Sequence, residues 1–399
     1  MTLLQRPRTR EQLISLITEA CELEHGLACS YLFAAFSLKQ RPTEGGVSTD
    51  QAHLVKFWAS QIFFVASQEM LHLAQAWNIL SAIGGTPYCL RPNLPQNSRY
   101  YPLHARIALE PFGVKCLKRF IVYETPENAT VPWVTHQAAL SQAERERGHV
   151  SIGELYGAIA DGVRTIPGLF EGNRANQVDV RSVQFHDLIA VVDAESALQA
   201  IAQITHQGEG TVADRADCHY GIFLGILTTF EREQAAAGAA FEPVRPVLAN
   251  PVAHSDDGYG AAAHPIKDAQ TRETALLFDA TYLLMLQSLG FGFTPSADAE
   301  RSRRACAAAI ELMTTVIRPL GDALTSMPAG VDGCSGGPAF GLTRFIALPA
   351  DPRFAIAQIR ERLGELAENA ERLADARPGT QQLIVAAARL RDIAARCTP

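Results

Sequence analysis

Glu69 and His72 form a short pattern, Glu-x-x-His, whose residue types can bind a metal ion. Residues three apart lie on one face of a helix. Because that face also carries Ile62, Leu73 and Leu80, the pair is predicted to point into the protein core. A buried carboxylate beside a buried imidazole needs a compensating partner, since uncompensated charge is very costly in a medium of low polarity.

Two more glutamates are predicted to face the same interior. Glu24 shares its helical stripe with Ile17 and Leu27, whereas Glu22 points outward. Glu154 lies on a side of its helix that carries small residues, which leave room for close packing or for a ligand. The alternative for Glu24 is an ion pair with a core-facing His or Arg. The alternative for Glu154 is an exposed position on a short amphipathic helix.

A fourth region offers Glu209, which lies between two glycines, and His219, which shares a face with Phe223 and Phe230. The face of His219 predicts that its imidazole points inward. A solvated turn is the alternative for Glu209, and a hydrogen-bonded core histidine is the alternative for His219. Only the combination with the other three positions favours a common site.

Taken as a set, these residues match a known pattern of metal ligands. Two helices supply one glutamate each, and two others supply a glutamate with a histidine, as in carboxylate-bridged di-iron or di-manganese bundles. Four carboxylates largely neutralise two divalent ions, and two imidazoles complete the donor set. The predicted ligands are Glu24, Glu69, His72, Glu154, Glu209 and His219. The sequence leaves open whether Glu209 or another carboxylate completes the set, and whether the charges instead form a salt-bridge network in a metal-free helical binding module.

Helices are expected to position these residues, because apolar residues recur mostly at three- and four-residue spacing. The chain is therefore predicted to be mainly α-helical. Proline-rich residues 86–111 are expected to form a covering strap. A segment rich in Ala, Pro and Gly at 235–260 predicts two domains, 1–235 and 236–399. The expected helices are 9–39, 52–83, 113–124, 149–164, 194–207 and 214–234, followed by 266–289, 297–326 and 353–374.

Composition excludes several classes of protein. Hydrophobic residues make up 47% of the 399 residues and charged residues 19%, which is typical of a globular protein. A net charge of −7 argues against a nucleic-acid partner. The eight cysteines include no Cys-x-x-Cys pair, and the most apolar stretch carries Asp279 and Gln287 near its middle. With no signal peptide or membrane span recognised, the expected location is the cytoplasm, without a membrane partner.

Several stretches carry a resemblance to a known family. They are ELEHGL at Glu22–Leu27, ASQEMLHLAQAWNILSAIGG at Ala66–Gly85, LEPFG with LKRFIVYETPE at Leu109–Glu127, SIGELY at Ser151–Tyr156, and QGEGT with HYGIF beyond it. With these stretches the chain resembles the ferritin-like portion of iminophenylpyruvate dimer synthases and their shorter stand-alone relatives. The resemblance spans most of residues 9–230 and implies a ferritin-like four-helix bundle, here with an additional C-terminal helical region. It also implies two bound iron ions, with manganese as the other candidate.

One departure from the ferritin-like pattern concerns the last bundle helix, where the family normally repeats Glu-x-x-His. Here Glu209 and His219 are ten residues apart. The helix must therefore break between them. We expect this break to open one side of the metal pair to a ligand.

Three functions are compatible with these expectations. In the first, reduced iron activates oxygen and the protein is a metal-dependent oxidoreductase or oxygenase of secondary metabolism, acting on a small amino-acid-derived or aromatic substrate. The second, implied by the resemblance, is metal-assisted coupling of an imine or enamine. The third, iron storage without catalysis, is disfavoured because the chain adds a strap and a long C-terminal region to the bundle. The expected partners are a small-molecule substrate and molecular oxygen, with a second copy of the chain as a further candidate.

Overall fold

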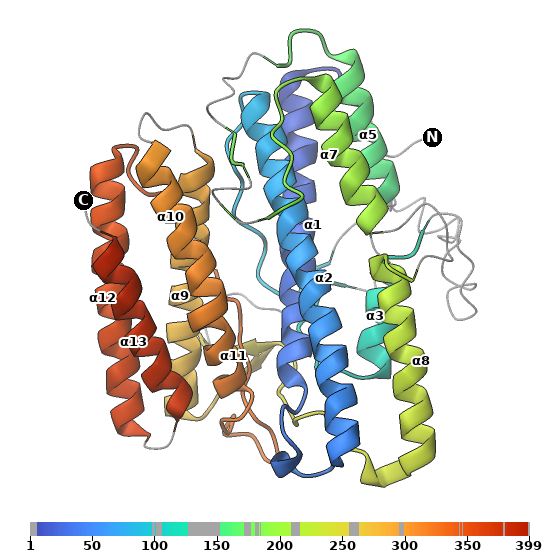
Figure 1. The fold of residues 1–399 in the computed structure, drawn as a ribbon, viewed down its shortest axis with the longest axis vertical. Helices are drawn as coiled ribbons and strands as arrows, with labels where there is room; N and C mark the ends of the chain where they lie inside the picture. The colour runs from blue at the N-terminus through green and yellow to red at the C-terminus, as the bar shows by residue number, and fades with distance from the viewer. Residues whose placement is uncertain are drawn as a thin grey trace.

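Two long helices form the centre of the molecule. The computed structural model describes residues 6–97, 100, 106–126, 152–170, 177–179, 183, 185–208, 216–254, 263–294, 299–342, 344, 346–377 and 380–397. Within these ranges the chain is mainly α-helical, which confirms the predicted fold class. Helices α1 (Arg10–Ser37) and α2 (Thr49–Ala82) pack side by side along the length of the molecule (Figure 1). Each begins at a hydroxyl N-cap, Thr9 for α1 and Ser48 for α2.

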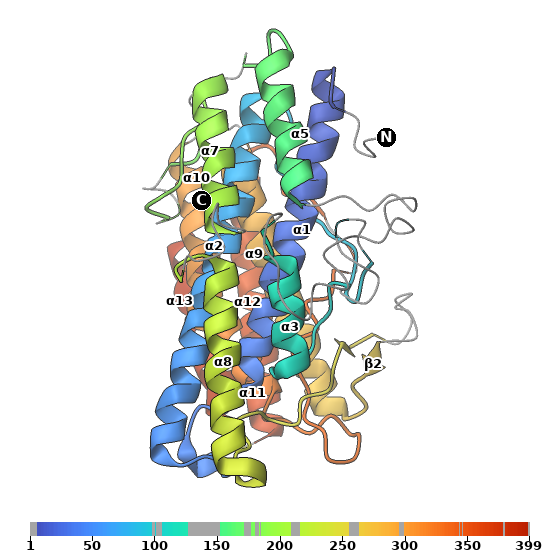
Figure 2. The same cartoon turned by 90° about the vertical axis from the view of Figure 1, so that its right-hand side faces the viewer.

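The other two positions of the bundle are each occupied by two shorter helices. One contains α3 (Val114–Tyr123) and α5 (Ile152–Thr165), and the other contains α7 (Ala194–Gln207) and α8 (His219–Ala237). Figure 2 shows α5 above α3 and α7 above α8. Helix α3 packs against α8, and α5 packs against α7. Helix ends therefore lie about halfway along the bundle, beside the uninterrupted α1 and α2.

The C-terminal helices form a second group beside α1 and α2 (Figure 1). They are α9 (Ala269–Phe293), α10 (Ala299–Leu312), the π-helical η5 (Met313–Ile317), α11 (Arg318–Leu324), α12 (Pro352–Ala376) and α13 (Gln381–Arg396). The 3₁₀ turns η1 (Pro42–Glu44) and η4 (Gly238–Ala240) and a parallel pair of strands, β1 (Pro251–Val252) with β2 (His264–Pro265), lie in the connections. Helix α13 was not predicted, although its stripe of Leu383, Leu390 and Ile393 is buried.

A single hydrophobic cluster joins the two groups of helices. It runs from Leu13 in α1 to Cys397 after α13. The predicted boundary after residue 235 falls within α8, which continues to Ala237. The division into two domains stays a prediction.

Among the described residues, one helix, α9, has the length and apolar composition that a membrane crossing would require. However, 67% of its most apolar window is buried inside the molecule, and a core helix meets the same criterion. Its buried Asp279 accepts a hydrogen bond of 2.9 Å from the backbone N–H of Gly341. The packing of α9 against α10 and α12 accounts for its apolar composition without a membrane.

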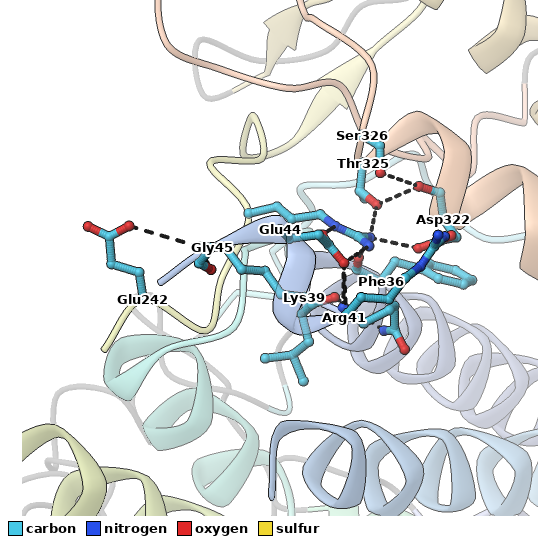
Figure 3. A network of polar contacts seen from close by, with 12 residues as sticks. Phe36, Lys39, Arg41, Glu44, Gly45, Glu242, Asp322, Thr325 and Ser326 are labelled. Atoms are coloured by element: carbon cyan, nitrogen blue, oxygen red, sulfur yellow. Dashed lines mark hydrogen bonds and ion pairs between the residues drawn. The ribbon is translucent and has the colours of Figure 1, made fainter. Parts of the chain in front are cut away.

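Buried Arg245 connects the two groups of helices through a polar network. Figure 3 shows Glu44, Asp322 and Thr325 of this network close together. Its Nε donates to Glu44 Oε2 at 2.7 Å, and its Nη1 donates to Asp322 Oδ1 at 2.7 Å and to Thr325 Oγ1 at 2.8 Å. A further bond of 3.2 Å reaches the carbonyl of Phe36 at the end of α1. The guanidinium thus ties the chain after α8 to both α1 and α11.

Replacing Arg245 with leucine should destabilise the protein, because Glu44 and Asp322 would lose their buried cation. We expect a loss of about 2–3 kcal/mol in the free energy of unfolding; this lies below the cost of breaking a fully buried pair, since both carboxylates keep some contact with water. Chemical denaturation followed by circular dichroism would measure it. The matched control is Arg353→Leu, which removes an exposed pair with Asp351 and should leave stability nearly unchanged. Equal stability of the two variants would contradict the proposed role of Arg245.

Candidate metal centre

Helices α1 and α2 place three ionisable side chains in the core of the bundle. Glu24 is 5% exposed, Glu69 is 1% exposed and His72 is 2% exposed. Their apolar neighbours on the same faces, such as Leu27 and Leu73, are buried as well. Because both helices run uninterrupted through the core, their 3.6-residue period turns all three side chains inward, as predicted.

Two further side chains come from helix ends in the middle of the bundle. Glu124 is the C-cap of α3, and His219 is the first residue of α8, after the N-cap Cys218. Glu124 is 4% exposed and His219 is fully buried. The interruptions of the two outer helices therefore bring a carboxylate and an imidazole to the same interior as Glu69.

Glu69 joins the five side chains into two overlapping groups. Its Oε2 lies 3.3 Å from His72 Nδ1, and its Oε1 lies 2.8 Å from His219 Nδ1. Glu24 Oε2 lies 3.4 Å from His72 Nδ1, and Glu124 Oε2 lies 3.5 Å from His219 Nδ1. Within each group of three, the potential ligand atoms lie within 4.8 Å of one another. The arrangement offers two adjacent binding positions bridged by one carboxylate.

Two buried tyrosines hold the outer carboxylates. The hydroxyl of Tyr156 in α5 donates to Glu24 Oε1, and that of Tyr31 in α1 donates to Glu124 Oε1. Each bond uses one carboxylate oxygen and leaves Oε2 facing a histidine. Burial raises the pKa of Tyr156 well above its ordinary value, so this hydroxyl remains a donor at neutral pH.

The charges of the cluster compensate one another. Burial opposes ionisation of Glu69, but the positive charges of His219 and His72 beside it hold the pKa of Glu69 well below its usual range. Burial also disfavours charged imidazoles, yet the surrounding glutamates raise the pKa of His219 to about 9 and that of His72 well above its ordinary value. Burial and the charge of Glu69 raise the pKa of Glu24 to about 8. Without a cation, the cluster therefore retains protons that free side chains would release at neutral pH.

The donor set fits two divalent transition-metal ions. Three described carboxylates and two imidazoles are oxygen and nitrogen donors of the kind that iron and manganese accept. His219 Nδ1 is buried and lies 2.8 Å from Glu69 Oε1, but it makes no hydrogen bond of acceptable direction. A cation between these groups would satisfy this nitrogen and replace the retained protons.

A small cavity opens onto the cluster. Its volume is about 30 Å³, which accommodates one water molecule or a molecule of similar size. The lining comprises Glu24, Leu27, Glu69, His72, Tyr123, Glu124, Ile152, Tyr156, Ile204, Thr205 and Gly208. A methyl group added at Gly208 would lie 3.5 Å from Glu124 Oε2. The cavity therefore reaches the end of α7, where the fourth helix of the bundle is interrupted.

The structure brings together Glu24, Glu69, His72 and His219, all of which the sequence analysis placed in one site. Glu209 lies outside the described residues. The predicted break in the last helix is present between α7 and α8. The roles of these side chains as metal ligands stay predictions.

The prediction that Glu154 faces the interior is wrong. Glu154 is exposed in the first turn of α5, whereas Leu155, Tyr156 and Ile159 are buried. The small residue Gly157, which had suggested an inward face, is exposed as well. Helix α5 instead turns the hydroxyl of Tyr156 toward Glu24.

Glu124 is a carboxylate of the cluster that the sequence analysis did not single out as a candidate ligand. The sequence contained a hint of its inward position, because Glu124 comes directly after a strongly amphipathic segment whose apolar face includes Phe120 and Tyr123. Its position at the end of a short helix, before Pro126, concealed its role. Only the packing of α3 against α8 shows that this helix end lies in the core.

The sequence is similar to those of several known proteins. A family model described as "Ferritin-like" matches residues 17–228. Dichlorochromopyrrolate synthase of Lentzea aerocolonigenes is 30% identical over 401 residues, covering 91% of this chain and 39% of that protein. 2-Imino-3-(indol-3-yl)propanoate dimerase of Chromobacterium violaceum is 28% identical over 360 residues, covering 84% of this chain and 34% of that protein. This chain thus spans less than half the length of either relative.

A solved structure also resembles the chain. The crystal structure of a ferritin like protein from Caulobacter vibrioides is 21% identical in sequence and superimposes with a TM-score of 0.48. The alignment covers 71% of this chain and 87% of that one.

The contrast between Glu124 and Glu154 gives a direct test of the site. Glu124→Gln should reduce metal content from about two ions per chain to about one, because a ligand of one position is lost. Glu154→Gln, on an exposed position of α5, should keep both ions. Elemental analysis and competition with a chromophoric chelator would measure the difference. Loss of metal in the Glu154 variant but not in the Glu124 variant would contradict the site described.

The retained protons predict that rising pH lowers the stability of the metal-free protein and increases the additional stability that bound metal provides. Between about pH 7 and 8.5, unfolded histidine and glutamate are deprotonated, whereas folded His219 stays largely protonated and folded Glu24 loses its proton only as the pH passes about 8. Rising pH should therefore lower the melting temperature of the metal-free protein. The stabilisation gained on adding metal should increase over the same interval, since fewer protons must be displaced.

Thermal melts at several pH values, with chelator and with metal, would test both trends. The variant His219→Gln is the control, because it should lose much of the pH dependence of the metal-free protein. A metal-free melting temperature that rises with pH over this interval would contradict the charge distribution described.

Proposed function

Because this chain belongs to the ferritin-like family, we propose that it is an iron-dependent enzyme that oxidises a small amino-acid-derived or aromatic substrate with molecular oxygen. The observation that carries the proposal is the pair of buried ligand groups that share Glu69. Two bound iron ions would supply the electrons that oxygen requires, and manganese is the other candidate metal.

The roles of the side chains follow from their positions. Glu24 and His72 would hold one ion, Glu124 and His219 would hold the other, and Glu69 would bridge them. The tyrosine hydroxyls fix the outer carboxylates, so that their free oxygens keep a constant direction. Burial of the whole cluster excludes bulk water from the reacting centre.

The size of the cavity suggests that oxygen and the organic substrate bind at different places. At about 30 Å³ it accommodates a molecule the size of water or oxygen beside the ligands, but not an aromatic amino-acid derivative. We expect the organic substrate to approach from the side of Gly208, where the cavity reaches the end of α7. The interruption of the fourth helix would then serve access rather than metal binding.

The names of the relatives favour a second candidate function. One is a synthase of dichlorochromopyrrolate, and the other is a dimerase of 2-imino-3-(indol-3-yl)propanoate, a molecule with an imine and a carboxylate. In this alternative the metal ions would polarise such a substrate for coupling in secondary metabolism, without consuming oxygen.

An iron titration and an oxygen measurement would test these proposals together. Ferrous iron added anaerobically should saturate near two ions per chain, and His72→Ala should abolish most of this binding. The loaded protein should consume oxygen slowly alone and faster with 2-imino-3-(indol-3-yl)propanoate generated in the assay. Product formation from the imine without added oxygen uptake would support coupling instead.

Two further results would bear on the proposal. Uptake of many iron ions per chain into a particle the size of a ferritin cage would indicate iron storage and contradict the proposal that the protein is an enzyme. Gly208→Val should retain both ions but slow the oxygen consumption that depends on the substrate, because its side chain would fill the cavity beside Glu124. Unchanged consumption in this variant would show that the substrate uses another approach.

A further inference from the structure

Both histidines of the cluster have a glutamine on the nitrogen that faces away from the carboxylates. His219 Nε2 lies 3.0 Å from Gln68 Oε1, and His72 Nε2 lies 3.0 Å from Gln207 Oε1. An amide oxygen can only accept a hydrogen bond, so each Nε2 must carry a hydrogen. In a neutral imidazole the lone pair is then on Nδ1, the atom that faces Glu69 in both cases.

These two bonds also fasten the interrupted part of the bundle. Gln207 is the last residue of α7 and bonds to His72 on α2, whereas Gln68 on α2 bonds to His219, the first residue of α8. Both ends of the interruption are therefore tied to the same uninterrupted helix. A displacement of either end would move an imidazole relative to Glu69.

The chemical nature of the two partners matters as much as their positions. A carboxylate in this place would draw the hydrogen from Nε2 and make the imidazole a stronger electron donor to a metal. An amide is neutral and exerts this effect far more weakly. Metal ions held by these histidines would therefore keep more of their positive charge.

From this geometry we infer that Gln68 and Gln207 are positioning residues for the metal pair. They direct Nδ1 of each histidine toward Glu69. They also keep the reduction potential of the bound iron higher than it would be with carboxylates in their places. The inference rests on the proposed iron site. It adds the assignment of two side chains that do not touch the metal positions themselves.

Gln75 provides a matched control on the same helix. Its amide donates to Gln203 Oε1 at 2.9 Å and accepts from the backbone N–H of Ile189 at 3.2 Å. It is fully buried and contacts none of the five clustered side chains through these bonds. Gln75→Leu therefore reports the cost of losing a buried glutamine without altering a histidine.

The experiment compares Gln68→Leu, Gln207→Leu, Gln68→Glu and Gln75→Leu with the wild-type chain. Each of the first two should weaken the binding of one metal ion by about 10–100-fold, as measured by competition with a chelator, while Gln75→Leu should not. Gln68→Glu keeps an acceptor and should retain metal. Its iron should have a lower reduction potential, because the carboxylate stabilises the oxidised state.

Two results would overturn the inference: metal affinities of the Gln68→Leu and Gln207→Leu variants equal to that of Gln75→Leu, or an unchanged or higher potential in Gln68→Glu. A third measurement needs no metal. In protein with ¹⁵N-labelled histidine, the Nε2–H signal of His219 should be protected from exchange and lose this protection in Gln68→Leu, while that of His72 stays protected. If the wild-type chain binds no metal, the proposed function and the effect on potential both fail, and this signal alone decides whether the glutamines position the imidazoles.

Discussion

The buried carboxylate of Glu69 is the group on which the rest of the site depends. It is almost fully excluded from water, and removing such a charge from water costs several kcal/mol unless partners surround it. His72 and His219 approach its two oxygens from different helices. Glu24 lies beside His72, and Glu124 lies beside His219. The bundle can tolerate this concentration of charge only because each member has a partner, whether that partner is a proton or a metal ion.

The interruptions of the two outer helices follow from the same requirement. An unbroken helix presents a side chain to the core only every three or four residues, so it offers few choices of direction. A helix end, in contrast, can bring a side chain such as Glu124 or His219 into the core from the side. The two backbone ends at the interruption of the fourth helix are held by hydrogen bonds that His72 donates to Gln207 and His219 donates to Gln68.

The C-terminal helices do not contribute a side chain to the described cluster, but they cover the other face of α1 and α2. Arg245 and the shared hydrophobic cluster hold the two groups of helices together. Helices α1 and α2 carry Glu24, Glu69 and His72. The additional region therefore packs against the two elements on which the site is built, whereas the cavity lies on the side of α7.

The mainly helical fold, the interruption before α8, and the inward direction of Glu24, Glu69, His72 and His219 could all be predicted from the sequence. These features depend on local periodicity and on glycine placement, which are properties of neighbouring residues. Two features could be seen only in the folded molecule: Tyr156 rather than Glu154 faces the core, and Glu124 completes the described cluster. Both features depend on how short helices pack against their neighbours. In a helix of ten to fourteen residues, the hydrophobic pattern is too short to determine which face turns inward or what surrounds the helix ends.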